Sequence, residues 1–258
     1  MSKVVVFHGI DHKVGTTLLV QSVAEWIAKE QKHLSVMMIS MNARKSTEYV
    51  REVTESIENF RIQLDHRMLD ANQIMKLCQW KSNLCLLSGI GSQLDHRSYH
   101  PDHAGYLLRM LEDQVDLILI DSGNEIDHGL AVGALAYSQN RFLILTQQES
   151  MLHRYEQLNH LYQELSIQFS RFIINKFQTS DPYNLSYIQK RTGIPTFIMK
   201  IISYTEYYRQ AEMEYRSLVS YQDARMQADL AGLSREVMSV ALVPSTEKKR
   251  KISWKNFI

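Results

Sequence analysis

The stretch from Val4 to Val20, VVVFHGIDHKVGTTLLV, constrains the fold of this chain more than any other. An apolar run rich in β-branched residues ends at Gly9, and apolar residues recur with helical spacing after Gly15. A strand, a tight loop and a helix in this order place backbone N–H groups and a helix N-terminus where they can hold phosphate. The sequence therefore predicts a phosphate-binding loop between residues 9 and 17.

This loop departs from the usual pattern, GxxxxGK[ST], at one position. Gly9, Gly15 and Thr17 match the pattern, but Thr16 stands where the phosphate-binding lysine belongs. The glycines and the hydroxyl are kept, and the main positive charge is missing. Lys13 in the same loop could reach a phosphate from a new position, although a solvated loop lysine is the favoured interpretation.

Composition favours a globular chain in a reducing compartment. Of its 258 residues, 45% are hydrophobic and 22% are charged, which is ordinary for soluble proteins. No apolar run approaches the ~20 residues that cross a bilayer, and no signal peptide opens the sequence. Cys78 and Cys85 indicate two half-buried thiols without a disulfide framework. We expect a cytoplasmic domain over residues 1–243 and a basic-aromatic tail over residues 244–258.

The tail concentrates positive charge. Residues 245–258 hold five basic residues and one acidic residue, a net charge of +4, which leaves −3 for the rest of a chain whose total is +1. We therefore do not expect the domain itself to bind nucleic acid. Trp254, Phe257 and Ile258 give the segment Lys248–Ile258 an apolar side suited to a membrane surface. A disordered basic terminus, or one that contacts a protein or nucleic acid, is the alternative.

Apolar runs and helical patterns alternate along the chain. Because the runs are apolar on both faces, they predict an α/β fold with a doubly wound, mostly parallel sheet and helices on both faces. The predicted strands are Val4–Phe7, Leu34–Ile39, Phe60–Leu64, Leu84–Leu87, Val115–Asp121, Asn140–Thr146, Arg171–Asn175 and Thr196–Ile201. The predicted helices are Thr16–Lys32, Ser46–Asn59, Asp70–Trp80, His103–Gln114, one ending at Tyr137, Ser150–Ser166, Asp181–Arg191, Thr205–Tyr215 and Tyr221–Ala241.

Asp121 ends the buried run VDLILID. Ligands bind at the carboxyl ends of parallel strands, so this carboxylate could hold Mg²⁺ through water, with the hydroxyl of Thr17 as a second ligand. A turn aspartate is the alternative, because Ser122, Gly123 and Asn124 are turn formers.

The order of motifs extends this interpretation. VVVFHG…VGTT, VMMISMN, VDLILIDSG, RFLILTQQES and RFIINK together resemble the MinD/ParA family of deviant phosphate-loop ATPases, over Val4 to Val219. The resemblance implies a P-loop NTPase-like fold, a homodimer, and ATP with Mg²⁺ as cofactor. It implies that Lys13, Gly15, Thr16 and Thr17 line the phosphates, that Asn175 reads adenine, and that Thr17 and Asp121 hold the metal. The stretch from Thr146 to Glu149 resembles the family's TxPE segment.

The departures from the family pattern cluster on catalysis. They are Asp11 for the signature lysine, His12 and Lys13 for two glycines, Thr16 for the phosphate lysine, Ser40 and Asn42 for the two carboxylates of DxD, and Ile201-Ile202 without the following proline. A lysine at the β/γ-phosphates neutralises charge that develops in the transition state. We therefore expect no fast hydrolysis, and ATP binding that is weak or absent.

One branch of that family, the pilus-assembly proteins TadZ and CpaE, also has a small residue in place of the phosphate lysine. This resemblance implies a cytoplasmic scaffold or positioning factor for a membrane-associated machine, such as a pilus or secretion apparatus, located at the inner face of the membrane. Two alternatives stay open. One is a slow ATPase switch in which Lys13 replaces the missing lysine, and the other is a DNA-associating partition factor that uses the tail.

The segment Ser88–His100 is a long polar loop. His96, His100 and His103 have spacing that could bind zinc, with Asp95 and Asp102 nearby. A polar loop without metal is the favoured interpretation.

Overall fold

The computed structural model describes residues 3–52, 54–92 and 95–243. Nine strands of these residues form one sheet: β1 (Val4–Gly9), β2 (Val36–Ser40), β3 (Glu55–Ser56), β4 (Gln79–Lys81), β5 (Leu84–Ser88), β6 (Leu117–Asp121), β7 (Asn140–Thr146), β8 (Arg171–Phe177) and β9 (Met199–Ser203). The strand order is β3-β5-β2-β6-β1-β7-β8-β9, and β4 pairs with β5. Within the described residues every pair is parallel except β4–β5.

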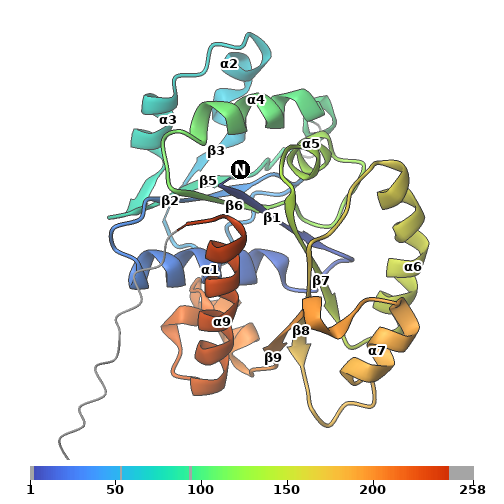
Figure 1. Ribbon diagram of the computed structural model, residues 1–258. Coiled ribbons are helices and arrows are strands. Elements are labelled where there is room, and N and C mark those ends of the chain that lie inside the picture. Colours follow the sequence, from blue (N-terminus) through green and yellow to red (C-terminus); the bar gives the residue numbers. More distant parts are fainter. Residues whose placement is uncertain (1–2, 53, 93–94, 244–258) are drawn as a thin grey trace, which may run out of the picture.

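Helices cover both faces of this sheet. They are α1 (Thr16–Glu30), α2 (Arg61–Asp65), α3 (Ala71–Leu77), α4 (Pro101–Leu111), α5 (Gly129–Tyr137), α6 (Glu149–Glu164), α7 (Leu185–Thr192), α8 (Tyr207–Glu214) and α9 (Ala224–Val240). Figure 1 shows α1 and α9 packed together on one face, with α4 and α5 packed together on the other. This arrangement confirms the predicted doubly wound α/β fold, and its parallel strands bring their carboxyl ends to one edge.

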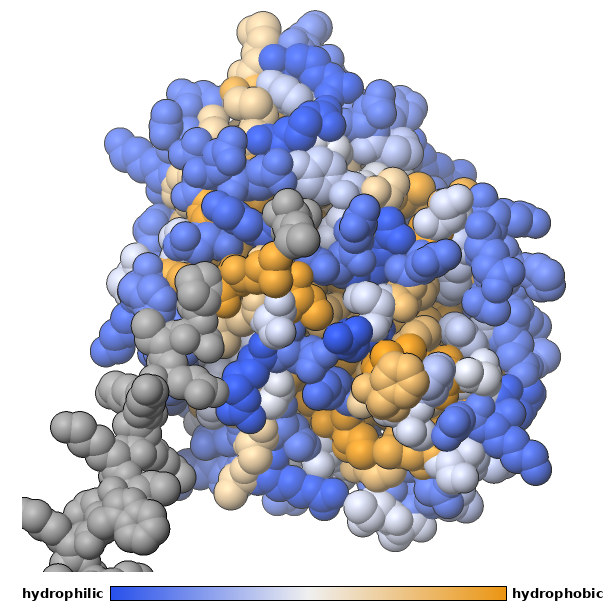
Figure 2. All heavy atoms as spheres, in the orientation of Figure 1, coloured by the Kyte–Doolittle hydropathy of each residue, from blue (hydrophilic) through white to orange (hydrophobic). Residues whose placement is uncertain are grey.

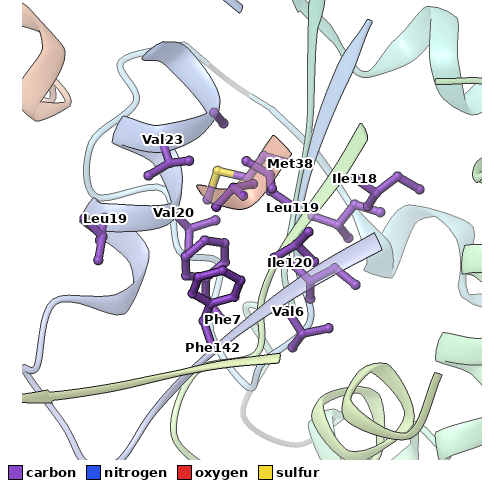
Figure 3. Close-up of a cluster of buried hydrophobic side chains, with 14 of the residues drawn as sticks. Val6, Phe7, Leu19, Val20, Val23, Met38, Ile118, Leu119, Ile120 and Phe142 are labelled. Carbon is purple, nitrogen blue, oxygen red and sulfur yellow. The ribbon is translucent and has the colours of Figure 1, made fainter. Parts of the chain in front are cut away.

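The central strands are buried on both faces, as their continuous apolar runs predict. Every residue of β1 and of β6 is buried. The rings of Phe7 in β1 and Phe142 in β7 stack with centroids 5.1 Å apart. In Figure 3, Val20 and Val23 of α1 point toward these strands. The outer surface is mostly hydrophilic in the view of Figure 2.

Residues 46–64 differ from the sequence prediction. The predicted helix Ser46–Asn59 is absent from the described part of that segment, which is irregular up to β3 and then forms a 3₁₀ turn, Ile57–Phe60. The predicted strand Phe60–Leu64 is instead α2. Pairing with β5 holds this segment: Ser56 Oγ donates to Gly89 O at 2.7 Å, and Ser88 Oγ donates to Glu55 O at 2.8 Å. Contacts with a distant strand thus override the local pattern.

Two other elements have different bounds in the structure from those predicted. The predicted helix Asp70–Trp80 ends at Leu77, and the antiparallel strand β4 follows it. The predicted strand Thr196–Ile201 begins with a 3₁₀ turn, Thr196–Ile198, and the strand itself covers Met199–Ser203.

The two cysteines and the helices bear on the predicted compartment and on the membrane. Cys78 and Cys85 are buried free thiols. Among the described residues, no helix combines the length and the apolar character that crossing a bilayer requires. The predicted membrane-binding segment Lys248–Ile258 lies outside the described residues.

Candidate functional site

A pocket of ≈ 420 Å³ opens at the carboxyl edge of the sheet. Its walls are the loop of residues 11–18, the segment 42–49 after β2, residues 123–125 after β6, and side chains from β8 and α8. The lining therefore includes four of the five predicted nucleotide contacts, Lys13, Gly15, Thr16 and Thr17. Asn175 and Asp121 lie behind this lining and contact it, as described below.

The loop after β1 is held against the end of β6. Gly9 N donates to Gly123 O at 2.7 Å, and Ser122 Oγ donates to Phe7 O at 3.0 Å. His8 is fully buried with its Nδ1 2.9 Å from Ser122 Oγ, and burial lowers its pKa to about 4. The neutral imidazole therefore serves as an internal hydrogen-bonding group that joins the two strand ends.

Positive φ angles shape the loop itself. Gly15 caps α1 with a φ of 92°, and a Cβ there would lie 2.7 Å from Asn175 Nδ2. Lys13 also adopts a left-handed conformation, with a φ of 60°. That conformation costs a non-glycine residue roughly 1–2 kcal/mol. The resembled family has glycine at this position, so the backbone of Lys13 keeps the conformation that glycine favours. The first turn of α1 has no side-chain cap, and its N–H groups face the loop region as an anion site requires.

Thr16 is buried at the foot of this loop. Its Oγ1 lies against Gly9, since a Cβ on Gly9 would be 2.5 Å from it. The short side chain brings no charge to the pocket. A small hydroxyl residue packed on the end of β1 thus fills position 16, where the pattern GxxxxGK[ST] has lysine.

Thr17 and Asp121, predicted as metal ligands, lie together. Thr17 Oγ1 donates to Asp121 Oδ2 at 2.6 Å, and Gly123 N donates to Asp121 Oδ1 at 2.9 Å. Asp121 is fully buried, and burial raises its pKa, while the hydrogen bonds from Thr17 and Gly123 act in the opposite direction. A hydroxyl and a carboxylate in contact are hard oxygen donors, so the pair fits a hydrated Mg²⁺.

Asn42 stands where the resembled family has the second carboxylate of DxD. Its amide is committed to the turn that follows β2. Its Nδ2 donates to Ser46 Oγ at 3.0 Å, and its Oδ1 accepts from Arg44 N at 2.9 Å. The side chain is buried. It therefore braces a turn at the pocket wall and offers no carboxylate that could orient a water molecule for attack.

Asn175 also faces inward. Its Nδ2 donates to Val14 O at 2.7 Å, and its Oδ1 accepts from Tyr208 Oη at 3.0 Å. Both ends of the buried amide are thus used to join the loop, β8 and α8. In this structure Asn175 supports the loop from behind, and its predicted contact with adenine stays a prediction.

Lys176 is a pocket residue that sequence reasoning missed. Its Nζ donates to Lys13 O at 2.7 Å, and it lines the pocket beside that residue. A lysine at the end of a strand is usually solvated, so the sequence gives no reason to single it out. The signal that could have found it is its place directly after Asn175, at the same edge of the sheet.

Two histidines of the proposed zinc spacing, His100 and His103, lie at the start of α4, and His96 begins the 3₁₀ turn His96–Ser98 before it. His103 Nδ1 accepts from His100 N at 3.2 Å, and its Nε2 lies 3.3 Å from Asp65 Oδ1. Both ring nitrogens of His103 are therefore engaged within the chain. No group of three metal-ligating side chains is found in the part of the chain that the structure describes, and the side chain of His96 lies outside it.

Comparison with known proteins identifies the fold. The sequence matches no family model and no curated protein. A ParA family ATPase from Chlorobium tepidum is similar in structure, with a TM-score of 0.79, 19% identity, and coverage of 91% of this chain and 98% of that one. The septum site-determining protein MinD of Pyrococcus horikoshii, complexed with Mg-ADP, is also similar in structure. Its TM-score is 0.75 and its identity 15%, with coverage of 96% of this chain and 100% of that one.

MinD from the MinC:MinD cell division complex of Aquifex aeolicus is similar as well, with a TM-score of 0.70, 16% identity, and coverage of 96% of this chain and 98% of that one. The chain therefore has the α/β fold seen in P-loop NTPases of the MinD/ParA type. The similar solved structures include a ParA family ATPase and a MinD cell division ATPase.

Proposed function

We propose that this chain is a catalytically degenerate MinD/ParA-like protein that acts as a scaffold or positioning factor for a membrane-associated machine. One contrast carries the proposal. The Thr17–Asp121 pair and the backbone of the loop are kept, whereas the two positions that supply charge for hydrolysis hold Thr16 and Asn42. Asn42 is moreover locked into a turn by Ser46 and Arg44.

A role in positioning a cellular machine is supported by the names of the proteins with similar structures. They include a septum site-determining protein and a cell division complex with MinC. We propose that this chain likewise binds protein partners, forms a homodimer, and uses residues 1–243 as the P-loop domain. The narrower assignment to a TadZ- or CpaE-like pilus or secretion scaffold rests on the small residue at position 16. Association with a membrane through Lys248–Ile258 belongs to the same proposal.

Nucleotide is optional in this proposal. Thr17 and Asp121 would hold Mg²⁺, and the backbone around Gly15 would receive phosphate oxygens. The bound metal would screen phosphate charge. The chain itself lacks a lysine at position 16 to neutralise charge on the reacting phosphate, and a carboxylate at position 42 to orient water. It would therefore hold ATP, where it binds, without fast turnover.

The experiment is localisation of the full chain, fused to a fluorescent protein, in its own cells. Asp121→Asn removes the metal-binding charge while an amide can still bond to Thr17 and Gly123. We expect this variant to occupy the same cellular site as the wild type and as Asp127→Asn, which changes an exposed aspartate. A diffuse Asp121→Asn signal beside a correctly placed Asp127→Asn control would show that positioning needs metal and nucleotide, and would contradict the proposal.

A further inference from the structure

The end of β8 carries an irregularity directly beside the loop. Ile174 pairs with Ile201 and Phe177 pairs with Ser203, so β8 has one more residue than β9 between these pairs. Lys176 lies within this bulge with a φ of 55°. Bulges of this kind change the direction of side chains and are common next to functional sites.

The bulge turns two consecutive side chains toward the same loop. In a regular strand, neighbours point to opposite faces. Here Asn175 reaches Val14 O at 2.7 Å, and Lys176 reaches Lys13 O at 2.7 Å. A left-handed conformation is unfavourable for lysine, so the chain accepts local strain that brings an ammonium group to the carbonyl of Lys13.

That ammonium group stands in an unfavourable environment. Burial and the nearby Lys13 both lower the pKa of Lys176. Neither lysine forms an ion pair among the described residues. Lys176 also lies 5.4 Å from the ring centroid of Tyr208, which partly offsets the cost of its burial. The pocket lining also includes four acidic residues, Asp11, Glu48, Glu125 and Glu212, but none of them forms an ion pair with either lysine. Two neighbouring ammonium groups that are not ion-paired within the described residues are poised to receive a multiply charged anion.

We propose that Lys13 and Lys176 form a two-lysine clamp for a phosphoanion, which replaces the positive charge lost at Thr16. The inference rests on the proposed function in that it concerns the same pocket, and it names the residues that hold the polyphosphate group. Lys176 Nζ has two further N–H groups after its bond to Lys13 O. Those donors, with the ammonium of Lys13, would contact phosphate oxygens in the pocket that both lysines line.

The test measures binding of three probes to the full chain by calorimetry: ADP, inorganic pyrophosphate and adenosine. We expect Lys176→Met and Lys13→Met each to weaken ADP and pyrophosphate binding by about tenfold or more, because each removes a charge-assisted bond. Adenosine binding should not change. Lys190→Met is the matched control, since Lys190 is exposed on α7 and away from the pocket. Lys176→Arg should retain most of the affinity.

The probes distinguish a clamp for any polyphosphate from a clamp for nucleotide. Loss of both ADP and pyrophosphate binding in Lys176→Met supports a clamp that takes any polyphosphate, and loss of ADP alone supports a clamp specific for nucleotide. Equal ADP affinity in wild type and Lys176→Met overturns the inference, as does a wild type that binds neither anion. Should Lys176→Met fail to fold, ¹³Cε-lysine NMR of the wild type replaces it: pyrophosphate should raise the pKa of Lys176, and an unchanged pKa overturns the clamp.

The same samples keep this inference distinct from the scaffold proposal. Fast ATP turnover by the wild type would contradict the scaffold and leave the clamp intact. Binding that is insensitive to both lysines would contradict the clamp and leave the scaffold intact.

Discussion

Replacing Thr16 with lysine is expected to raise the affinity for Mg·ATP by about 10- to 100-fold. Position 16 begins α1 and lines the pocket, so a longer side chain can leave its contact with Gly9 and extend toward the phosphates. Hydrogen bonds to charged groups contribute about 1.5–3 kcal/mol net, which converts to this range of affinity. Isothermal titration of the purified full chain measures the change.

Thr16→Met is the control for this experiment. It adds similar length to the buried position without charge, so any effect of repacking against Gly9 appears in both variants. We expect Thr16→Met to bind Mg·ATP no better than the wild type. Equal affinities for the lysine and methionine variants, with both folded, would show that this pocket does not place phosphate beside residue 16. That result would contradict the assignment of residues 9–17 as a phosphate loop.

Replacing Asn175 with alanine is expected to lower the free energy of unfolding by roughly 2–4 kcal/mol, since it leaves one buried and one half-buried polar group without their partner. Those groups are the carbonyl of Val14 and the hydroxyl of Tyr208. Denaturant unfolding monitored by circular dichroism gives the change in free energy. Hydrogen exchange at residues 10–17 should accelerate, because Asn175 holds the loop from behind.

Asn72→Ala provides the comparison, because Asn72 is an exposed residue of α3. We expect it to change stability by less than about 0.5 kcal/mol. If Asn175→Ala left loop exchange at the wild-type rate, the loop would not depend on β8 for its shape. The view that internal contacts hold this loop without nucleotide would then be wrong.

Much of the fold could be predicted because the central strands are buried on both faces. β1, β6 and β7 are continuous apolar runs, and their predicted positions agree with the structure to within about two residues. Residues 60–64 show why other parts could not be predicted. Phe60, Ile62 and Leu64 alternate as in a strand, but they form helical turns in which Phe60 and Leu64 are buried and Ile62 is 70% exposed. Periodicity in five residues cannot separate these two outcomes.

The candidate site also contains residues that the sequence predicts and one residue that it does not. Thr17 and Asp121 follow from motif positions, and the structure brings them to 2.6 Å. The position of Lys176 depends on an extra residue in β8 and on a positive φ angle. No glycine in β8 marks the extra residue or the positive φ angle. The sequence alone therefore does not reveal that two adjacent side chains reach one loop.

We infer that the chain keeps the loop and the metal pair but does not hydrolyse ATP at a useful rate. Phosphate release by the full chain at saturating Mg·ATP tests this directly, with Asp121→Asn as the blank and an intact MinD or ParA ATPase assayed alongside. We predict that the wild type releases phosphate no faster than Asp121→Asn. Turnover comparable to that of the intact ATPase, and lost in Asp121→Asn, would contradict the account.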